Sequence, residues 1–364
     1  MNTTFDAQNS IRAETLMSEP TSSKTELSEL GEFGLIRRLT ENIVLKNEST
    51  LKGVGDDCAV LSFKDKKVVV TTDLLTEGVH FNLMYVPLRH LGYKAVTVNL
   101  SDVYAMNAIP KQITVSIAVS SKMSVEALDE LYSGIYLACD RYGVDLVGGD
   151  TTTSLTGLLI SVTAIGEADQ QDLVYRNGAK DTDLLCVTGD LGGAYMGLQL
   201  LERENEVFKV NPKMVPQFTG YDYILERQLK PEARKDIPLL FKELGIKPTS
   251  MIDISDGLSS EILHLCTQSE VGCRLYEDRL LYDNQTRKMA AELNINPLVA
   301  ALNGGEDYEL LFTLPVADND KIRNHPDISV IGYITPMNEG VNLITAGVGQ
   351  AIPLQAQGWN PLKE

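Results

Sequence analysis

The alternation of apolar runs with polar turns predicts two successive α/β units. In the first unit apolar residues recur at helical spacing over 27–45, and a hairpin follows with strands over 58–61 and 67–72. Pro87 stands at a helix-start position and opens a helix that reaches about Asn107. A strand over 112–119, a helix over 124–142 and strands over 144–147 and 158–165 complete this unit. A polar, turn-rich segment over 168–180 marks the boundary.

The second half repeats the alternation. It predicts strands over 184–188, 251–254 and 272–276, a helix over 258–267, helices around 285–301, and strands near 308–314, 328–334 and 341–345. The fold class is therefore α/β with mixed sheets, in an N-terminal domain over 29–168 and a C-terminal domain over 169–364. Residues 1–28 lack Gly and Cys and show no sustained periodicity, which predicts a flexible tail.

Composition excludes several function classes. A chain of 364 residues with 43% hydrophobic and 23% charged residues has room for two domains of roughly 150 residues each. The net charge of −18 argues against nucleic acid or an anionic membrane as a partner. Five cysteines without a C-x-x-C pair indicate neither a disulfide framework nor a zinc site, which favours a cytoplasmic protein. No apolar stretch approaches the length of a membrane span.

Acidic residues stand where apolar runs stop. Two carboxylates about 4 Å apart repel by roughly 4 kcal/mol at an effective dielectric near 20, so a converging cluster would need cations. Hard oxygen ligands select Mg²⁺ or Mn²⁺, which also bind phosphates. The leading hypothesis is a metal-dependent enzyme that acts on phosphates. The residues concerned are Asp56, Asp57, Asp73, Asp102, Asp150, Asp253 and Asp256.

Each motif taken alone has a plain alternative. A Gly-Asp turn in solvent accounts equally well for Asp56 and Asp57, of which only one can easily face a site. Asp102 is the better clue, because it lies inside an otherwise apolar helix. We expect Gly148–Asp150 to form a turn after a strand whose glycines let phosphate approach the backbone.

Two further motifs combine glycine with acids. Asp253–Gly257 stands at a strand-to-helix junction, where a helix N-terminus favours anions, although Asp256 could simply cap the helix. Gly304–Glu309 is a Gly-Gly-acid turn before a strand. Gly189–Gly193 has the wrong spacing for a dinucleotide site and predicts a helix-packing turn. The chain has no P-loop and no protein-kinase signature. Among four scattered histidines, His80 alone merits a site assignment.

In order and over about 30–360, the motifs resemble those of the thiamine-monophosphate kinase family. They are Gly31–Phe33, Gly55–Ala59, Thr72 and Asp73 with His80, Tyr93–Asp102, Gly148–Thr151, Asp253–Leu258 and Gly305–Leu310. The resemblance implies the fold of the aminoimidazole-ribonucleotide synthetase superfamily, with two α/β domains and a homodimer whose N-terminal strands form a barrel between the subunits. It also implies ATP-dependent phosphorylation of thiamine monophosphate to the diphosphate, the last step of thiamine diphosphate biosynthesis.

The resemblance also implies roles for individual residues. Several Mg²⁺ ions would be held by Asp57, Thr71, Thr72, Asp73, Asp102, Asp150, Asp253 and Asp256, among which Asp102, Asp150 and Asp253 would be catalytic. ATP would contact Tyr132, Gly149, Arg176 and Ser255, and thiamine monophosphate would contact His80, Glu306 and Trp359. For Trp359, the only tryptophan, C-terminal packing is the alternative to an aromatic platform for the cationic thiazolium ring.

The implied reaction needs positioning and charge neutralisation, since the acceptor phosphate is already a nucleophile at neutral pH. We therefore expect direct in-line transfer without a phosphoenzyme. Selenide-dependent dikinases carry a Gly-rich segment with a reactive Cys or selenocysteine, and hydrogenase maturation relatives end in a reactive Cys. Residues 1–28 hold neither Gly nor Cys, and the chain ends in Glu364. A purine-pathway cyclo-ligase and a divalent-cation buffer or nucleotide sensor without turnover stay open as rivals.

Overall fold

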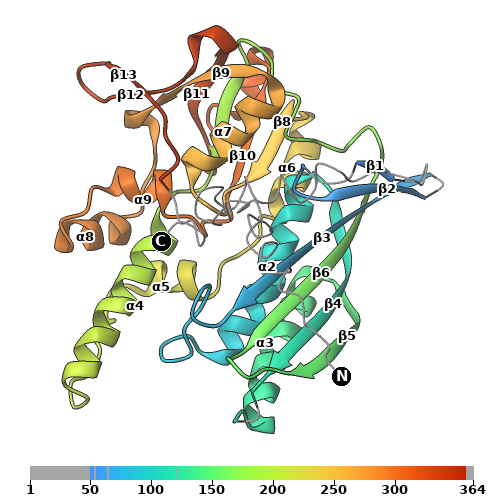
Figure 1. Ribbon diagram of the computed structural model, residues 1–364. Coiled ribbons are helices and arrows are strands. Elements are labelled where there is room, and N and C mark those ends of the chain that lie inside the picture. The colour runs from blue at the N-terminus through green and yellow to red at the C-terminus, as the bar shows by residue number, and fades with distance from the viewer. Residues whose placement is uncertain (1–49, 53–54, 64, 121, 358–364) are drawn as a thin grey trace, which may run out of the picture. The chain divides into compact units, whose positions relative to one another are not determined.

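The computed structural model describes residues 50–52, 55–63, 65–120 and 122–357. The tail expected over 1–28, the helix expected over 27–45 and Trp359 lie outside these residues. The described chain contains two sheets (Figure 1). All strands of the first come before residue 169 and all strands of the second after residue 183.

The first sheet has six strands in the order β1-β2-β3-β6-β4-β5. Its strands are β1 (Thr50–Lys52), β2 (Ala59–Phe63), β3 (Lys66–Thr76), β4 (Ile109–Val119), β5 (Asp145–Thr153) and β6 (Leu159–Ala168). Neighbouring strands are antiparallel, except for the parallel pair of β4 and β5. In β6 buried and half-buried residues alternate, so the sheet buries one face and leaves the other accessible.

Two helices cover the buried face of this sheet: α2 (Leu88–Ala105) packs on the strands and α3 (Val125–Tyr142) packs on α2. Glycines allow the close approach of the helices, because a Cβ on Gly92 would lie 1.9 Å from the Leu131 carbonyl oxygen. Ser124 caps α3 by accepting from the Ala127 N–H, and Gly143 ends it in a left-handed conformation. Helix α2 is buried on nearly all sides, so its polar residues must find partners in the interior.

The second sheet has seven strands in the order β13-β12-β9-β11-β7-β10-β8. Its strands are β7 (Leu184–Thr188), β8 (Ser250–Asp253), β9 (Val271–Tyr276), β10 (Leu310–Leu314), β11 (Ile328–Pro336), β12 (Val341–Ile344) and β13 (Ala351–Pro353). The helices of this half are α4 (Gly193–Val210), α5 (Asp222–Leu229), α6 (Asp236–Leu244), α7 (Leu258–Ser269), α8 (Asn284–Glu292), α9 (Pro297–Asn303) and α10 (Asn319–Ile322). Short 3₁₀ turns cover Glu277–Arg279, Val316–Asp318 and Met337–Glu339.

Two sequence predictions about local structure are wrong. The strand expected to end at Thr72 continues as β3 to Thr76, and the turn expected at Gly148–Asp150 is the middle of β5. Parallel pairing with β4 keeps these glycines extended, since Gly149 lies opposite Val115. A Cβ on Gly149 would lie 1.8 Å from the Val115 carbonyl oxygen, so strand packing alone already requires glycine there.

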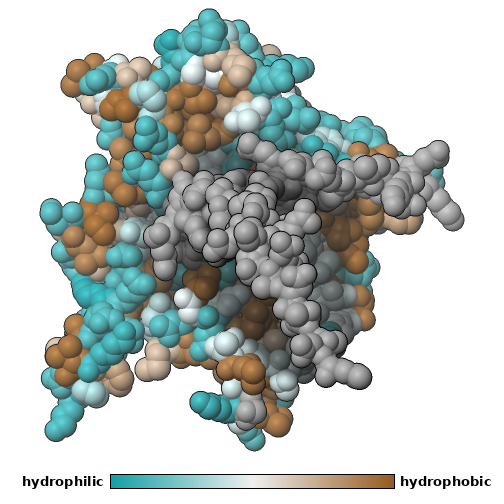
Figure 2. Space-filling view, viewed as in Figure 1, coloured by the Kyte–Doolittle hydropathy of each residue, from teal (hydrophilic) through white to brown (hydrophobic). Residues whose placement is uncertain are grey.

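The Gly189–Gly193 motif is a helix-packing turn, as predicted. Gly192 is the N-cap of α4 with φ of 79°, and a Cβ there would lie 2.9 Å from the Ala300 Cβ of α9. The surface visible outside the grey atoms is largely hydrophilic, as a chain with 23% charged residues leads one to expect (Figure 2). Within the described ranges no helix has both the length and the apolar character to cross a membrane.

Candidate metal and phosphate site

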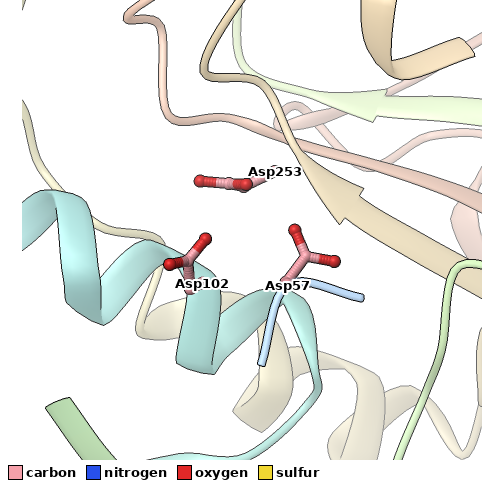
Figure 3. Close-up of side chains that lie close together, drawn as sticks. All are labelled: Asp57, Asp102 and Asp253. Carbon is pink, nitrogen blue, oxygen red and sulfur yellow. The ribbon is translucent and has the colours of Figure 1, made fainter. Parts of the chain in front are cut away.

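Three carboxylates from distant parts of the chain meet in one place. Asp57 precedes β2, Asp102 lies in α2 and Asp253 ends β8, and one oxygen of each lies within 4.8 Å of one oxygen of the other two. Figure 3 shows the three carboxyl groups facing one another. Asp57 and Asp253 are 7% and 3% exposed and Asp102 is half-buried, so water screens the charges of Asp57 and Asp253 only weakly.

Hydroxyl groups orient two of these carboxylates. Ser101 Oγ donates to Asp253 Oδ2 at 2.6 Å, and Thr71 Oγ1 donates to Asp102 Oδ2 at 2.6 Å. Asp73 lies two residues after Thr71 on the same face of β3, and its backbone N–H donates to the Asn99 side chain at 3.0 Å. Four predicted metal ligands, Asp57, Asp102, Asp253 and Thr71, are therefore joined by short contacts.

Arg176 brings a positive charge to this cluster. Its Nε and Nη2 each donate to one oxygen of Asp57 at 2.8 Å, a bidentate pair. Its backbone N–H contacts Asp56 Oδ1 at 3.4 Å, and Asp56 Oδ2 is buried without a hydrogen-bond partner in the described part of the chain, although Lys52 Nζ lies 3.8 Å away. Of the two adjacent aspartates, Asp57 is the one whose oxygens join Asp102 and Asp253.

The electrostatics of the cluster favour an added cation. Burial, followed by repulsion from Asp73, Asp253 and Asp57, holds the pKa of Asp102 well above its ordinary value. Burial and the Asp57 charge do the same to the pKa of Asp253. Burial raises the pKa of Asp73 to about 6. One guanidinium therefore does not neutralise the group, and a divalent cation would remove the remaining repulsion.

The strand-to-helix junction at 253–257 differs from the sequence interpretation. Asp256 does not cap α7: the N-cap is Gly257, without a side-chain cap bond. Glu261 in the first turn of α7 reaches back instead and accepts from the Asp256 N–H at 2.9 Å and the Ser255 N–H at 3.3 Å. The two backbone amides at the helix start, where an anion was expected, are thus already bonded to the Glu261 carboxylate. Ser255 is exposed and Asp256 is half-buried beside it.

Glu306 extends from a strained turn. Gly305, Glu306 and Tyr308 have φ of 70°, 58° and 50°, and two of them are not glycine. This turn is fixed to the strand-to-helix junction at 253–257. The Glu306 N–H donates to the Ser255 carbonyl at 2.6 Å, and the Tyr308 N–H donates to the Ile254 carbonyl at 2.9 Å. Hydrogen bonds therefore connect the backbone that carries Glu306, a predicted substrate contact, to the backbone that carries the predicted metal ligands Asp253 and Asp256.

A buried lysine holds the Glu306 carboxylate. Lys94 Nζ of α2 lies 2.8 Å from Glu306 Oε1, and Gln228 Nε2 of α5 donates to Glu306 Oε2 at 2.8 Å. The Lys94 side chain is 4% exposed and the Glu306 side chain 27%, so the carboxylate is the accessible member of the pair. His80 lies near this pair: burial lowers its pKa, while the Glu306 charge raises it and the Lys94 charge lowers it. The Thr76 N–H donates to His80 Nδ1 at 3.0 Å.

Glu309, in the same motif, is bonded inside the protein and stabilises the fold. Arg227 Nη1 and Arg234 Nη1 donate to its two oxygens at 2.8 and 2.6 Å, and Thr188 Oγ1 also donates to it. These bonds lower its pKa against the opposing effect of burial. Asp307 accepts from the Gly192 N–H at 2.8 Å and so fastens the turn to the start of α4.

Other predicted residues are not brought to the cluster. Thr72 points to the opposite face of β3 from Thr71, and its hydroxyl donates to the Val162 carbonyl at 3.0 Å. Asp150 is exposed on β5, and a pocket of about 520 Å³ lies there, lined by Asp150, Gly149 and Tyr132 among other residues. Tyr132 and Gly149, two predicted ATP contacts, thus border one pocket. The other two lie elsewhere, Arg176 against Asp57 and Ser255 in the strand-to-helix junction at 253–257.

Sequence reasoning missed the residues that support the ligands. They are Lys94, Asn99, Ser101, Gln228 and Glu261. Lys94, Asn99 and Ser101 interrupt an apolar helix, as Asp102 does, and that signal was available in the sequence. Nothing local distinguishes Gln228 or Glu261 from ordinary surface residues of a helix.

Comparisons with known proteins identify the family of this chain. The family model for the N-terminal domain of AIR synthase related proteins matches residues 55–168. The thiamine-monophosphate kinase of Aquifex aeolicus is 34% identical over 336 residues, which cover 92% of this chain and 98% of that enzyme. The chain belongs to the thiamine-monophosphate kinase family. The Bacillus subtilis member is 33% identical, with 92% of this chain and 100% of that enzyme covered.

Solved structures of family members extend the likeness to the fold. AaThiL complexed with AMPPCP and TMP has a TM-score of 0.80 and 33% identity, with 93% of this chain and 100% of that chain covered. Hydrogenase maturation protein HypE in complex with ATP shares the fold, with a TM-score of 0.64 at 20% identity. The mixed α/β fold of the synthetase superfamily is therefore confirmed, and the chain is an enzyme of the thiamine-monophosphate kinase family.

Proposed function

We propose that this protein transfers the γ-phosphoryl group of ATP directly to thiamine monophosphate, giving thiamine diphosphate, with Mg²⁺ assistance. The observation that carries the proposal is the convergence of Asp57, Asp102 and Asp253 from three separate elements. Membership of the kinase family and the likeness to AaThiL bound to AMPPCP and TMP support the choice of donor and acceptor.

The residues present suit divalent metal ions. The cluster offers only oxygen ligands, Asp57 and Asp253 in it are buried, and burial together with repulsion that a cation would remove raises the pKa values of Asp102 and Asp253. Asp57, Asp102 and Asp253 would hold the first ion, with Thr71, Asp73 and Asp256 at its margin. Bound Mg²⁺ would neutralise phosphate charge and keep donor and acceptor oxygens in line. Thr72 would act at another ion, and Asp150 would act at the pocket on β5 that it lines.

The protein's own groups would position the two substrates. Tyr132 and Gly149 border the pocket on β5 and are proposed to contact the nucleotide, with Arg176 and Ser255 as further contacts. Glu306 presents its carboxylate with Lys94 behind it, which suits the cationic thiazolium ring, and His80 lies beside that pair. Lys94 and Asp102 lie eight residues apart on α2, about 12 Å along the axis, so one elongated acceptor could reach from Glu306 to the metal ligands.

The proposed transfer forms no phosphoenzyme. The acceptor phosphate has a second pKa of about 6, so its oxygen is nucleophilic at neutral pH without a strong general base. Protein incubated with [γ-³²P]ATP, with and without thiamine monophosphate, should carry no label after rapid denaturation. Acid-stable or acid-labile radioactivity on the protein, at near one equivalent, would refute direct transfer.

The decisive assay mixes protein, MgATP and thiamine monophosphate and follows products by mass. Thiamine diphosphate and ADP should appear in equal amounts, and EDTA should stop the reaction. Turnover of a formylglycinamidine ribonucleotide in place of thiamine phosphate would instead identify a cyclo-ligase. Metal and nucleotide binding with no product from either acceptor would identify a cation buffer or a nucleotide sensor.

We further propose a homodimer formed through the open face of the first sheet, with strands of both subunits building a barrel. The described helices that cover this sheet, α2 and α3, lie on its other face, and Leu74 on the open face is 53% exposed. Light scattering coupled to size exclusion should give about twice the 40.0 kDa chain mass, and Leu74→Glu should shift it toward the monomer. A monomeric wild type would contradict this arrangement.

A further inference from the structure

The carboxylate of Glu261 contacts the backbone of the strand-to-helix junction at 253–257. Glu261 is 2% exposed in the first turn of α7. Its Oε1 accepts from the Asp256 N–H at 2.9 Å, the Ser255 N–H at 3.3 Å and the Ser255 hydroxyl at 3.4 Å. Its Oε2 is buried and, within the described ranges, has no hydrogen-bond partner.

The segment that Glu261 holds connects two proposed metal ligands, Asp253 and Asp256. The outer side of this segment is fixed by the 305–308 turn through the Ser255 and Ile254 carbonyl groups. Its end is fixed by Gly257, where a Cβ would lie 2.7 Å from the Leu302 carbonyl oxygen. The Ser255 and Asp256 amides complete the set of anchors, and Glu261 is their shared acceptor.

A buried carboxylate beside other carboxylates is unfavourable for folding. The helix dipole at the start of α7 offsets only about 0.3–1 kcal/mol of such a cost. Glu261 also does not join the three-carboxylate cluster, and its bonded oxygen faces backbone amides. Its contribution is therefore the geometry of the backbone that carries the ligands. Groups that orient metal ligands in this indirect way typically change metal affinity or activity by 10- to 100-fold when removed.

We infer that Glu261 is a positioning residue that sets the spacing of Asp253 and Asp256 by bonding the Ser255 and Asp256 backbone amides. This inference rests on the proposed function of the acid cluster as a metal site. The bond needs an acceptor at the reach of a glutamyl side chain. It does not need the negative charge.

Two conservative variants separate reach from charge. Glu261→Asp keeps the charge and shortens the side chain by one methylene, whereas Glu261→Gln keeps the reach and removes the charge. Free Mn²⁺ is measured by electron paramagnetic resonance in a titration of each protein without nucleotide. We expect Glu261→Asp to weaken Mn²⁺ binding by about 10-fold or more, and Glu261→Gln to bind close to the wild type. Glu126→Ala, which removes an exposed first-turn glutamate of α3, is the matched control.

Steady-state kinetics give a second readout. Glu261→Asp should raise the Mg²⁺ concentration for half-maximal rate while leaving the KM for thiamine monophosphate unchanged, and Glu261→Gln should restore it. Wild-type Mn²⁺ affinity in Glu261→Asp, or a loss in Glu261→Gln as large as in Glu261→Asp, would overturn the positioning role. A wild type that binds no Mn²⁺ would remove the metal site itself, and this inference with it.

Discussion

Removing one carboxylate from the cluster should stabilise the metal-free protein. At the 4.8 Å limit that encloses the three oxygens, two carboxylates repel by about 3.5 kcal/mol at an effective dielectric near 20. Arg176 already compensates Asp57, and protons taken up by the cluster relieve part of the rest. We therefore expect Asp253→Asn to raise the free energy of unfolding of the metal-free protein by about 1–2 kcal/mol. Ser101 can still donate to the new amide oxygen.

The sign of the pH dependence follows from the raised pKa values. A folded state that binds more protons than the unfolded chain loses stability as pH rises through the folded pKa. Burial raises the pKa of Asp73 to about 6, so its charge is present at pH 8 and partly neutralised near pH 5.5, and the raised pKa of Asp253 acts in the same direction. The stability that Asp253→Asn gains over the metal-free wild type should accordingly be large at pH 8 and small at pH 5.5.

The assay is thermal unfolding in EDTA and across a Mg²⁺ titration at both pH values. In EDTA at pH 8 the Tm of Asp253→Asn should exceed that of the wild type by a few degrees, since 1 kcal/mol corresponds to about 2–4 °C in a domain of roughly 150–250 residues. Mg²⁺ should raise the wild-type Tm and leave the variant nearly unchanged. Asp129→Asn on the exposed side of α3 is the control for a single lost charge. A metal-free variant less stable than the wild type at pH 8, or one stabilised equally by Mg²⁺, would refute the reasoning.

Three further substitutions test the surrounding structure. Glu306→Gln leaves the buried ammonium of Lys94 without its anion and should lower the free energy of unfolding in urea by about 2–4 kcal/mol, more than Lys94→Met does. The double variant should lose less than the sum of the two single losses, and additive losses would exclude a coupled pair. Gly149→Ala should lower the Tm sharply because its Cβ meets the neighbouring strand, whereas Gly148→Ala has open space and should be tolerated; equal Tm values for the two would contradict the strand packing. Asp102→Asn should reduce kcat by at least about 100-fold with an unchanged circular dichroism spectrum, and near-normal turnover at saturating Mg²⁺ would exclude it as a catalytic ligand.

Local pattern predicted most of the described elements, because helical and strand periodicities are properties of neighbouring residues. The long helix at 88–105, its partner at 125–142 and the strands of the second sheet other than β13 follow from apolar spacing, capping residues and glycine, whereas helices α4, α5 and α6 were not predicted. The pattern failed at Gly148 and Gly149, which local rules assign to a turn. The partner strand β4 lies too far away in the sequence for local rules to detect, and its pairing with β5 keeps both glycines extended.

The chemistry available to this protein can be read from its residues alone: oxygen ligands stand at the ends of apolar runs, in an acidic chain without a P-loop. Which carboxylates meet depends on the three-dimensional fold. The fold joins Asp57, Asp102 and Asp253, turns Thr72 to the opposite face of its strand, and places the Glu261 carboxylate at the helix start where an anion was expected. The reason is physical: repulsion between charges falls with distance in space, and the supporting contacts join residues as far apart in sequence as Ser101 and Asp253.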